Sequence, residues 1–521
     1  MRETRAVLAP IADPLARSWK WCLAGVLLLS LALRLWAIDF GLPYLEHPDE
    51  PFWVFKVLTM LKTADPNPHE FIYPSLYFYQ TALAYLVYYG AGRLLGAFHT
   101  LADLREPVLL VGGSGLTTLR GLILMGRVPS VLMGVATVAL VFDLGRRIFH
   151  STLGATLAAL FVAVSPALVA NSRYMIPDGP LALLTTLVVW GAWRIYERGR
   201  KVDYLLAAVC LGLAGGMKYN ALPFAIAPLL AHFLRPGSRG LRDLRLYVLP
   251  LVALAAFLVT TPFAVLDFGT FLKWATVNMN HYTGGHAGNS GSSLAWYLDT
   301  FWTTEGPVLV LATAGTILSV VRRSRGMIVV AATSLAYLIF LSLLAVHNVR
   351  TALPILPLWA LLAGYCAVEL LAGLTGEGER PGAYLGAAGL LVSLALIFPL
   401  AATVRDTVHL TRPDGMDTAR TWIAAELPAG SHIAVESYSP WVDPKKFVVM
   451  GFYKLNSQPP SWYKEKGYQY LVFSAEMFRR FYKDPAQFHD EIEAYETLFQ
   501  AFEPVKAFTD GGYEVRIYRV R

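Results

Sequence analysis

Two adjacent carboxylates, Asp49 and Glu50, follow shortly after the first long apolar segment of the chain, Trp21 to Ile38. Carboxylates are costly inside lipid, so acids kept this close to an apolar segment indicate chemistry. A carboxylate in such a position can act as a general base on a hydroxyl group. The alternative is that the two acids only cap and solvate a helix in an external loop, and the sequence leaves both interpretations open.

Three further groups of polar residues lie at the ends of other apolar segments. They are Arg173 and Asp178; Lys218, Tyr219 and Asn220; and His281, His286, His347 and Arg350. Cations of this kind can neutralise a bound or leaving phosphate. Tyrosines at headgroup level, such as Tyr73, can hold sugars and lipid chains together. These residue types therefore suit a site for a phosphate-linked sugar at a membrane surface.

Each of these residues also has a structural interpretation. Asp178 follows Pro177 and can cap the next helix, and Lys218 can extend toward lipid headgroups. Arg350 can anchor the end of a span, and a histidine in a loop is more often an ordinary polar residue. The functional interpretation rests on the placement of all these groups on one side of the membrane.

The composition indicates a polytopic membrane protein. Of 521 residues, 55% are hydrophobic and 16% are charged, whereas soluble proteins carry about a quarter charged residues. Apolar runs long enough to cross a bilayer recur along the chain. The first run is predicted to be a retained anchor, because it ends in Arg34 and Asp39 without a small-residue cleavage site.

The net charge of +7 does not indicate binding to nucleic acid, because acidic and basic residues nearly balance from Arg405 to the end. The excess lies in the apolar part, where it sets orientation. The three cysteines, Cys22, Cys210 and Cys366, fall in separate apolar segments. Neither a disulfide framework nor a zinc site is predicted.

The positive-inside rule assigns the basic clusters between apolar runs to the cytoplasm and orients the spans. About eleven crossings then put the N-terminus inside and the C-terminal region outside. The predicted spans lie near 21–38, 127–145, 151–170, 179–196, 204–218, 220–234, 246–264, 306–321, 327–346, 352–372 and 383–403. This topology places the polar groups on the external side of the cytoplasmic membrane.

The apolar segment Ser75 to Phe98 breaks this alternation, because a crossing there would turn every later basic cluster outward. We predict a helix in the outer interface, within an external loop from Asp39 to Gly126, and the tyrosines of the segment suit that position. The alternative is a transmembrane helix paired with a second short crossing near 107–124.

The predicted fold is an all-α transmembrane domain over residues 1–404, followed by a small external α/β domain over 405–521. A second external loop, rich in glycine, runs from Leu266 to Glu305. In the external domain we predict helices at 417–427 and 488–499, and strands at 432–436, 447–450, 468–473 and 513–518.

This arrangement resembles the GT-C glycosyltransferases, specifically the protein O-mannosyltransferase and lipid A aminoarabinose transferase group. Four motifs carry the resemblance. They are the acidic motif His47-Pro48-Asp49-Glu50, the aromatic-proline segment 71–77 (FIYPSLY), the second acidic motif 173–181 (RYMIPDGPL) and the glycine-lysine turn 215–219 (GGMKY). Each motif is short, but their order and their side of the membrane match the group.

The resemblance implies transfer of a sugar, with inversion, from a polyprenyl monophosphate to an acceptor hydroxyl on the outer face. It implies Asp49 as the base, Glu50 as its orienting or loop-supporting neighbour, Asp178 near the acceptor, and Lys218 at the donor phosphate. We expect Arg173, Tyr73, Tyr219, His281, His286 and Arg350 to line the substrate site. The expected partners are the lipid-linked donor, membrane lipids, and a protein, lipid or polysaccharide acceptor.

A divalent metal is not expected to be obligatory. The resemblance to aminoarabinose transferases implies a glutamate before the proline of the aromatic segment and a later histidine as metal ligands. Tyr73 stands at the glutamate position here, and tyrosine is a poor substitute. Glu70, with His281 or His286, remains a weak candidate set, and the mannosyltransferase-like interpretation fits better.

Two other functions remain as alternatives. A flippase or transporter for a lipid-linked substrate would need polar groups near the bilayer midplane, but the polar residues cluster at span ends. A polysaccharide ligase or polymerase of related fold would use a lipid diphosphate donor. A scaffold protein would not need so many spans.

Overall fold

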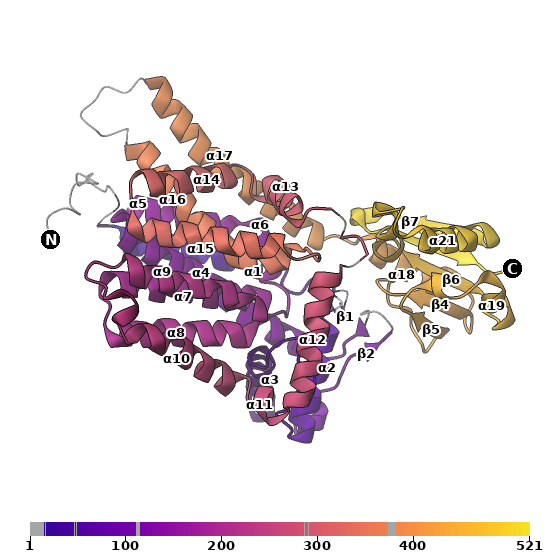
Figure 1. Ribbon diagram of the computed structural model, residues 1–521. Helices are drawn as coiled ribbons and strands as arrows, with labels where there is room; N and C mark the ends of the chain where they lie inside the picture. The colour runs from indigo at the N-terminus through magenta and orange to yellow at the C-terminus, as the bar shows by residue number, and fades with distance from the viewer. Residues whose placement is uncertain are drawn as a thin grey trace.

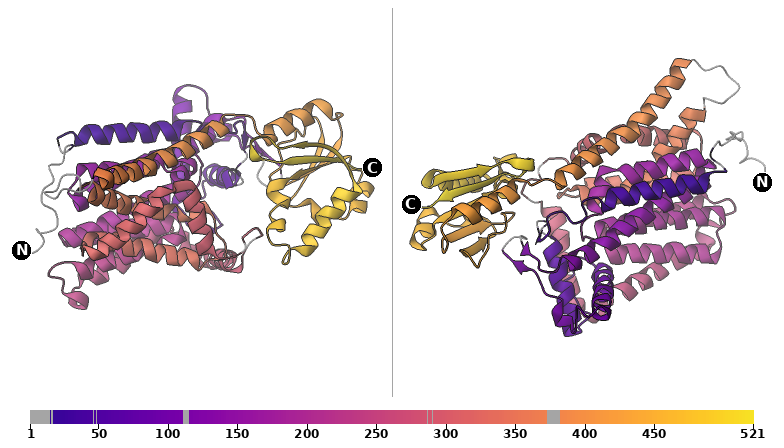
Figure 2. Two further views of the ribbon diagram at one scale, coloured as in Figure 1. Left: turned by 90° about the horizontal axis from the view of Figure 1, so that it is seen from above. Right: turned by 180° about the vertical axis from the view of Figure 1, so that it is seen from behind.

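The computed structural model describes residues 15, 17–45, 47, 49–110, 115–285, 287–289, 291–372 and 382–521. A bundle of long helices forms one part, and a C-terminal α/β domain lies at one end of this bundle (Figure 1). Figure 2 shows the same arrangement from above and from behind. This two-part architecture agrees with the predicted fold class.

The bundle is built from apolar helices that follow one another along the chain. They are α1 (Trp19–Leu35), α4 (Arg120–Phe149), α5 (Thr152–Val164), α6 (Pro166–Asn171), α7 (Asp178–Glu197), α8 (Lys201–Met217), η3 (Tyr219–Ala225), α9 (Ile226–Leu234), α10 (Arg245–Thr260), α14 (Pro307–Val321), α15 (Arg325–Ser342), η5 (Val349–Ile355), α16 (Leu356–Ala372) and α17 (Gly382–Leu410). Each predicted span coincides with one or two of these helices.

The number of crossings stays a prediction. Among the described residues, four helical segments are long and apolar enough to cross a membrane. A fifth span results if α13 (Ser293–Glu305) and α14, which are bent by 117° relative to each other at their junction, are counted together. Gly306 at this bend has φ +54°, a left-handed conformation that favours glycine, and Pro307 then starts α14.

Three helices run across the end of the bundle instead of along it (Figure 1). They are α2 (Asp49–Thr63), α3 (Leu76–Leu94) and α12 (Phe268–Gly284). The position of α3 in the membrane interface stays a prediction. Strands β2 (Val108–Leu109) and β3 (Gly115–Leu116) occupy part of the segment that the alternative needed as a second crossing.

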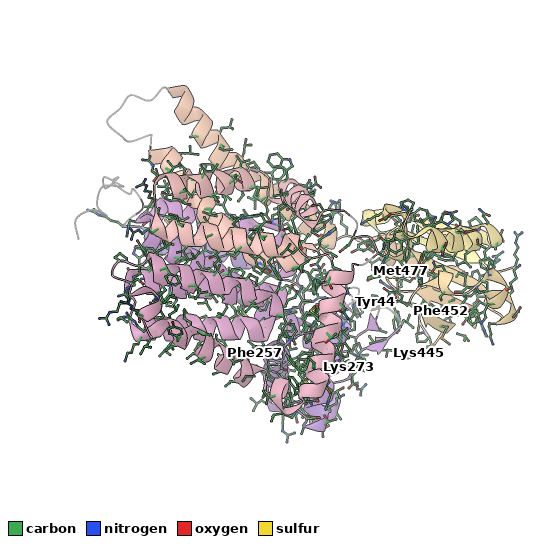
Figure 3. All side chains as sticks on the ribbon, in the orientation of Figure 1. Tyr44, Phe257, Lys273, Lys445, Phe452 and Met477 are labelled. Atoms are coloured by element: carbon green, nitrogen blue, oxygen red, sulfur yellow. The ribbon has the colours of Figure 1, made fainter. Side chains whose placement is uncertain are left out.

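Short elements complete this end of the bundle. They are β1 (Tyr44–Leu45), which pairs with β3 in a sheet of order β1-β3-β2, and the helices η1 (Leu101–Asp103) and α11 (Phe263–Leu266). Helix η4 (Gly240–Arg242) instead connects α9 to α10 at the opposite end, where the Gly240 carbonyl lies 3.0 Å from His232 Nε2. Tyr44 lies at the junction with the α/β domain (Figure 3), where the Arg420 guanidinium lies 3.6 Å from its ring centroid. A cleft of about 550 Å³ opens beside this pair.

The C-terminal domain is a five-stranded sheet with helices on both faces. Its elements are α18 (Gly415–Glu426), β4 (His432–Glu436), β5 (Val448–Phe452), η6 (Leu455–Ser457), α19 (Pro460–Glu465), β6 (Tyr470–Ser474), α20 (Ala475–Phe478), η7 (Phe481–Lys483), α21 (His489–Ala501), β7 (Glu503–Phe508), η8 (Asp510–Gly512) and β8 (Val515–Arg519). The strand order is β5-β4-β6-β8-β7, with β4 parallel to β5 and β6.

Alternating side chains of each strand divide the core of this domain in two. Ile433 and Val435 pack with α18 on one face, whereas Leu471 and Phe473 pack with α21 on the other. The prediction missed β7, an edge strand whose second residue is Pro504 and whose pairing with β8 has an irregular register between Pro504 and Lys506. Proline and charged residues are tolerated at an edge, so this strand lacks the usual sequence pattern.

Glu436, at the end of β4, is a fully buried carboxylate. It accepts hydrogen bonds from the backbone N–H groups of Ser474 (2.9 Å) and Leu455 (3.1 Å) and from the Tyr495 hydroxyl (2.8 Å). Burial raises the pKa of Glu436 to about 7, and these donors reduce the rise without cancelling it.

The stability of this domain should therefore fall as the pH rises from about 4.5 to about 7. In this range Glu436 keeps its proton in the folded domain but has lost it in the unfolded chain. The free energy of unfolding is therefore lower by on the order of 3 kcal/mol above pH 7 than below pH 4.5. Hydrogen exchange at Val435 and Val472, corrected for intrinsic rates, would measure this slope. Glu436→Gln should abolish it, whereas Glu465→Gln on the exposed surface should leave it unchanged. An equal slope in both variants would contradict the assignment.

Candidate active site

The first acidic motif lies at the start of α2. The backbone N–H of Asp49 donates to His47 Nδ1 (3.2 Å), and that of Glu50 donates to the His47 carbonyl (3.3 Å). Acids in a first helical turn are favoured by the helix dipole. Both acids thus lie in the first turn of a helix, as the capping interpretation expects, but their side chains pair with arginines of other elements.

Asp49 forms an ion pair with Arg350 of η5. The two side chains remain 27% and 30% exposed, so a substrate can reach them. Burial favours the neutral acid, but the charges of Arg350 and His47 outweigh it and hold the pKa of Asp49 below its ordinary value. Asp49 is thus an ionised carboxylate that can accept a proton.

A second ion pair joins Asp178, the first residue of α7, to Lys218, which follows α8. Lys218 Nζ donates to Asp178 Oδ1 at 2.6 Å, and the two side chains are only 6% and 1% exposed. Lys218 Nζ also lies 5.8 Å from the centre of the Tyr73 ring. The second acidic motif and the glycine-lysine turn therefore meet in space.

The two ion pairs form one cluster, which we call the four-charge cluster: Asp49, Asp178, Lys218 and Arg350. The charge of Lys218 contributes to the lowered pKa of Asp49. Asp178 interacts electrostatically with Arg350, as does the neighbouring Tyr282 of α12. Four segments that lie far apart in the sequence thus converge on one site.

Glu50 faces away from this cluster and holds α2 against the bundle. Arg127 of α4 binds its carboxylate in a bidentate manner, with distances of 2.8 and 2.7 Å. The backbone N–H of Met175 also donates to Glu50 (3.0 Å), and Arg127 donates to the carbonyls of Ile38 and Phe40. Of the two roles predicted for Glu50, this geometry favours support of the loop.

Arg173 lies elsewhere in the bundle. Its Nη2 donates to the Leu33 carbonyl at the end of α1 (2.6 Å) and to the Thr407 hydroxyl of α17 (2.7 Å). A cation at a helix C-terminus satisfies carbonyl groups and the helix dipole. The structure therefore does not bring Arg173 into the four-charge cluster, where we expected a phosphate-binding role.

The remaining predicted site residues are distributed around the cluster. The Tyr219 hydroxyl donates to the Phe71 carbonyl (2.9 Å), and Tyr73 packs on Trp53. His281 lies on an exposed part of α12 beside Tyr282. His286 lies outside the described residues. His347 packs on Trp296.

The described residues do not offer a donor set for a divalent metal. Glu70 forms an ion pair with Lys56 at 2.7 Å. The part of the chain that the structure describes contains no group of three or more histidine, cysteine, aspartate or glutamate side chains suited to a metal.

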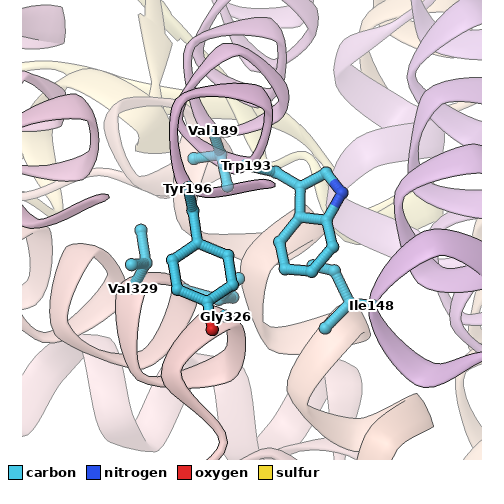
Figure 4. A pocket seen from close by; sticks show the side chains of 7 residues that line it. Ile148, Val189, Trp193, Tyr196, Gly326 and Val329 are labelled. Carbon is cyan, nitrogen blue, oxygen red and sulfur yellow. The ribbon is translucent and has the colours of Figure 1, made fainter. Parts of the chain in front are cut away.

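The cleft beside Tyr44 and a second cavity both lie apart from the four-charge cluster. The second cavity, of about 10 Å³, lies between α4, α7 and α15 and is lined by Trp193, Tyr196 and Gly326 among others (Figure 4). It is no larger than one water molecule needs. It is therefore a packing defect and not a substrate site.

Sequence inspection did not single out Arg127 or Tyr337, although both hold the site. Tyr337 of α15 donates to the Thr351 carbonyl (2.6 Å) next to Arg350. Its hydroxyl also accepts a hydrogen bond from Asn220 (2.8 Å), two residues after Lys218. The sequence shows Arg127 and Tyr337 each only as a polar residue inside an apolar helix, and this pattern does not reveal which residue it pairs with.

Comparison with known proteins supports the resemblance seen in the sequence. Residues 117–263 match the family model described as dolichyl-phosphate-mannose-protein mannosyltransferase. A search of curated protein sequences gives no significant match. The family match includes the second acidic motif and the glycine-lysine turn.

Two solved proteins share the fold of most of the chain. The archaeal oligosaccharyltransferase AglB from Archaeoglobus fulgidus, in complex with an inhibitory peptide and dolichol-phosphate, is 12% identical with a TM-score of 0.54, covering 94% of this chain and 72% of AglB. ArnT from Cupriavidus metallidurans bound to undecaprenyl phosphate is 15% identical with a TM-score of 0.54, covering 96% and 98%. Its apo structure has 14% identity, the same coverage and a TM-score of 0.53.

These likenesses confirm the resemblance to the GT-C group. The chain has the fold of GT-C glycosyltransferases, and the family model that it matches falls in the subgroup indicated by its motifs. Together with the apolar helices, this fold identifies an integral membrane protein.

Proposed function

We propose that this protein is an inverting glycosyltransferase that moves a sugar from a polyprenyl monophosphate to an acceptor hydroxyl on the outer face of the cytoplasmic membrane. The observation that carries the proposal is the four-charge cluster, in which an accessible carboxylate lies beside two cations. The family match and the shared fold support it, since AglB and ArnT were solved with polyprenyl phosphates.

The chemistry assigned to Asp49 is general base catalysis. Asp49 takes the proton of the acceptor hydroxyl as its oxygen attacks the anomeric carbon. The bond between that carbon and the phosphate oxygen breaks, and the lipid phosphate leaves with the electron pair. Attack opposite the leaving group inverts the anomeric carbon.

The two cations would bind the phosphate of the donor and of the product. Lys218 has three N–H donors and gives one to Asp178, whereas Arg350 has five and gives one to Asp49. Both therefore retain N–H groups for phosphate oxygens without losing their carboxylate partners. Charge-assisted bonds of this type stabilise the negative charge that develops on the leaving group.

A donor comparison with the purified protein tests the function. We expect transfer from polyprenyl monophosphate sugars to a hydroxyl acceptor in vesicles, with a panel that includes mannosyl, glucosyl and aminoarabinosyl donors. Transfer only from lipid diphosphate sugars would identify a ligase or polymerase instead. Movement of a lipid-linked sugar across the bilayer without transfer would identify a flippase.

Replacing Lys218 with glutamine should weaken binding of undecaprenyl phosphate by about tenfold to a hundredfold. The reason is the loss of a charge-assisted hydrogen bond worth about 1.5–3 kcal/mol. Fluorescence titration of the lipid in detergent would measure the change. Lys62→Gln is the matched control, because Lys62 pairs with Glu106 at a partly exposed position. Equal affinities of the two variants would remove Lys218 from the phosphate site.

A further inference from the structure

Two buried oxygen atoms beside the four-charge cluster have no hydrogen-bond donor within the described part of the chain. They are Asp178 Oδ2 and Asn220 Oδ1. Asp178 is fully buried, and of its two carboxylate oxygens only Oδ1 has a hydrogen bond in the described part of the chain, which it accepts from Lys218. Buried polar atoms are normally paired, so each exception calls for an explanation such as a bound substrate.

The orientation of the Asn220 amide is fixed by its neighbours. Tyr337 gives its single hydroxyl proton to the Thr351 carbonyl (2.6 Å), so its oxygen can only accept from Asn220. Asn220 Nδ2 therefore points to Tyr337 (2.8 Å) and to the Thr351 carbonyl (3.4 Å). Asn220 Oδ1 is left on the other side of the amide, where it can only accept a hydrogen bond.

Each of the two side chains contacts a residue that is a cation of the cluster or the neighbour of one: Asp178 bonds Lys218, and Asn220 bonds the carbonyl of Thr351, the residue after Arg350. Asn220 belongs to η3, which begins directly after Lys218. Its side-chain amide donates a hydrogen bond to the Thr351 carbonyl of η5, the helix that carries Arg350. Tyr337 interacts electrostatically with Asp178, which connects the amide to the acidic side of the cluster. A sugar attached to a phosphate at Lys218 would extend into this region.

We propose that Asp178 Oδ2 and Asn220 Oδ1 form a subsite that accepts hydrogen bonds from the hydroxyl groups of the transferred sugar. The inference rests on the proposed function and adds the class of sugar. Two oxygens that can only accept select hydroxyl or ammonium groups and reject a carboxylate at the same position. The donor is therefore a neutral or amino sugar on a polyprenyl phosphate, not a uronic acid.

A series of monodeoxy donors tests the subsite in the wild-type protein. We expect removal of at least one sugar hydroxyl to lower kcat/KM by tenfold or more, because it leaves a buried acceptor unpaired. The matching uronate donor should not be used. If every monodeoxy donor reacts within about twofold of its parent, or if the uronate reacts equally well, the proposal is overturned.

Asn220→Leu identifies which hydroxyl Asn220 binds. This near-isosteric change removes Oδ1, so kcat/KM for the parent donor should fall at least tenfold, while the corresponding deoxy donor should be almost unaffected. Tyr337→Phe is the control, because it loosens the amide but keeps Oδ1. Tyr337→Phe should lower kcat/KM by a similar factor for all donors, and the parent donor should still react faster than the deoxy donor.

The outcomes separate this inference from the proposed function. A uniform loss in Asn220→Leu for all donors would assign Asn220 a structural role and overturn the subsite alone. Absence of transfer from every polyprenyl phosphate sugar would overturn the proposed function and the subsite with it. Thermal unfolding and undecaprenyl phosphate binding of each variant would show that the fold and the phosphate site are retained.

Discussion

Replacing Asp49 with asparagine is expected to lower the rate of sugar transfer by about a hundredfold to ten-thousandfold, the usual contribution of a general base. Asparagine has nearly the same shape but cannot take a proton from the acceptor. Because the Asp49–Arg350 pair is partly exposed, its loss should cost no more than about 1 kcal/mol of stability. Single-turnover transfer from a prebound donor would measure the chemical step directly.

Asp39→Asn provides the matched control for this substitution. Asp39 is an exposed acid in the segment that links α1 to β1. Its variant should transfer sugar at the wild-type rate. If Asp49→Asn also retained the wild-type rate, Asp49 would not be the base, although the phosphate-binding role of Lys218 could still be measured separately.

Of all the substitutions proposed, those that break the Glu50–Arg127 ion pair should lower the free energy of unfolding the most. The two side chains are 0% and 1% exposed, and removing one member of a buried ion pair costs about 3–5 kcal/mol, because the other charge is left uncompensated. Arg127→Met would also leave the carbonyls of Ile38 and Phe40 without their donor. We expect a marked fall in the free energy of unfolding in detergent.

A double-mutant cycle measures the interaction energy between Glu50 and Arg127 separately from their interactions with other residues. Glu50→Gln combined with Arg127→Met should be less destabilised than the sum of the single variants, since neither charge remains buried. Glu106→Gln breaks the partly exposed Lys62–Glu106 pair and should cost no more than about 1 kcal/mol. Strictly additive effects of the Glu50 and Arg127 substitutions would show that the two side chains do not stabilise one another.

The positions of the helices could be predicted from the sequence, because apolar length and basic clusters are properties of local segments. The convergence of Asp49, Asp178 and Lys218 could also be predicted, but only as a shared side of the membrane. Which charges pair could not be predicted. Asp49 meets Arg350 and Asp178 meets Lys218 through tertiary packing that no local pattern encodes.

The arginines illustrate this limit most clearly. Arg127 and Arg173 both lie near the end of an apolar segment, and nothing in their immediate sequence separates their roles. Packing directs Arg127 to Glu50, whereas Arg173 reaches the end of α1. The C-terminal α/β domain shows the same limit at β7, where Pro504 and neighbouring charges obscure an edge strand that only its pairing with β8 defines.

The separation of the paired residues along the chain sets an order for biosynthesis. Glu50 and Arg127 are 77 residues apart, whereas Asp49 and Arg350 are 301 apart. At about 5–20 residues per second, the ribosome supplies the partner of Glu50 within seconds, but the partner of Asp49 on the order of 15–60 seconds after Asp49 itself. The nascent protein thus can fix α2 against α4 early, whereas the Asp49–Arg350 pair forms only once Arg350, about two thirds of the way along the 521-residue chain, has been made.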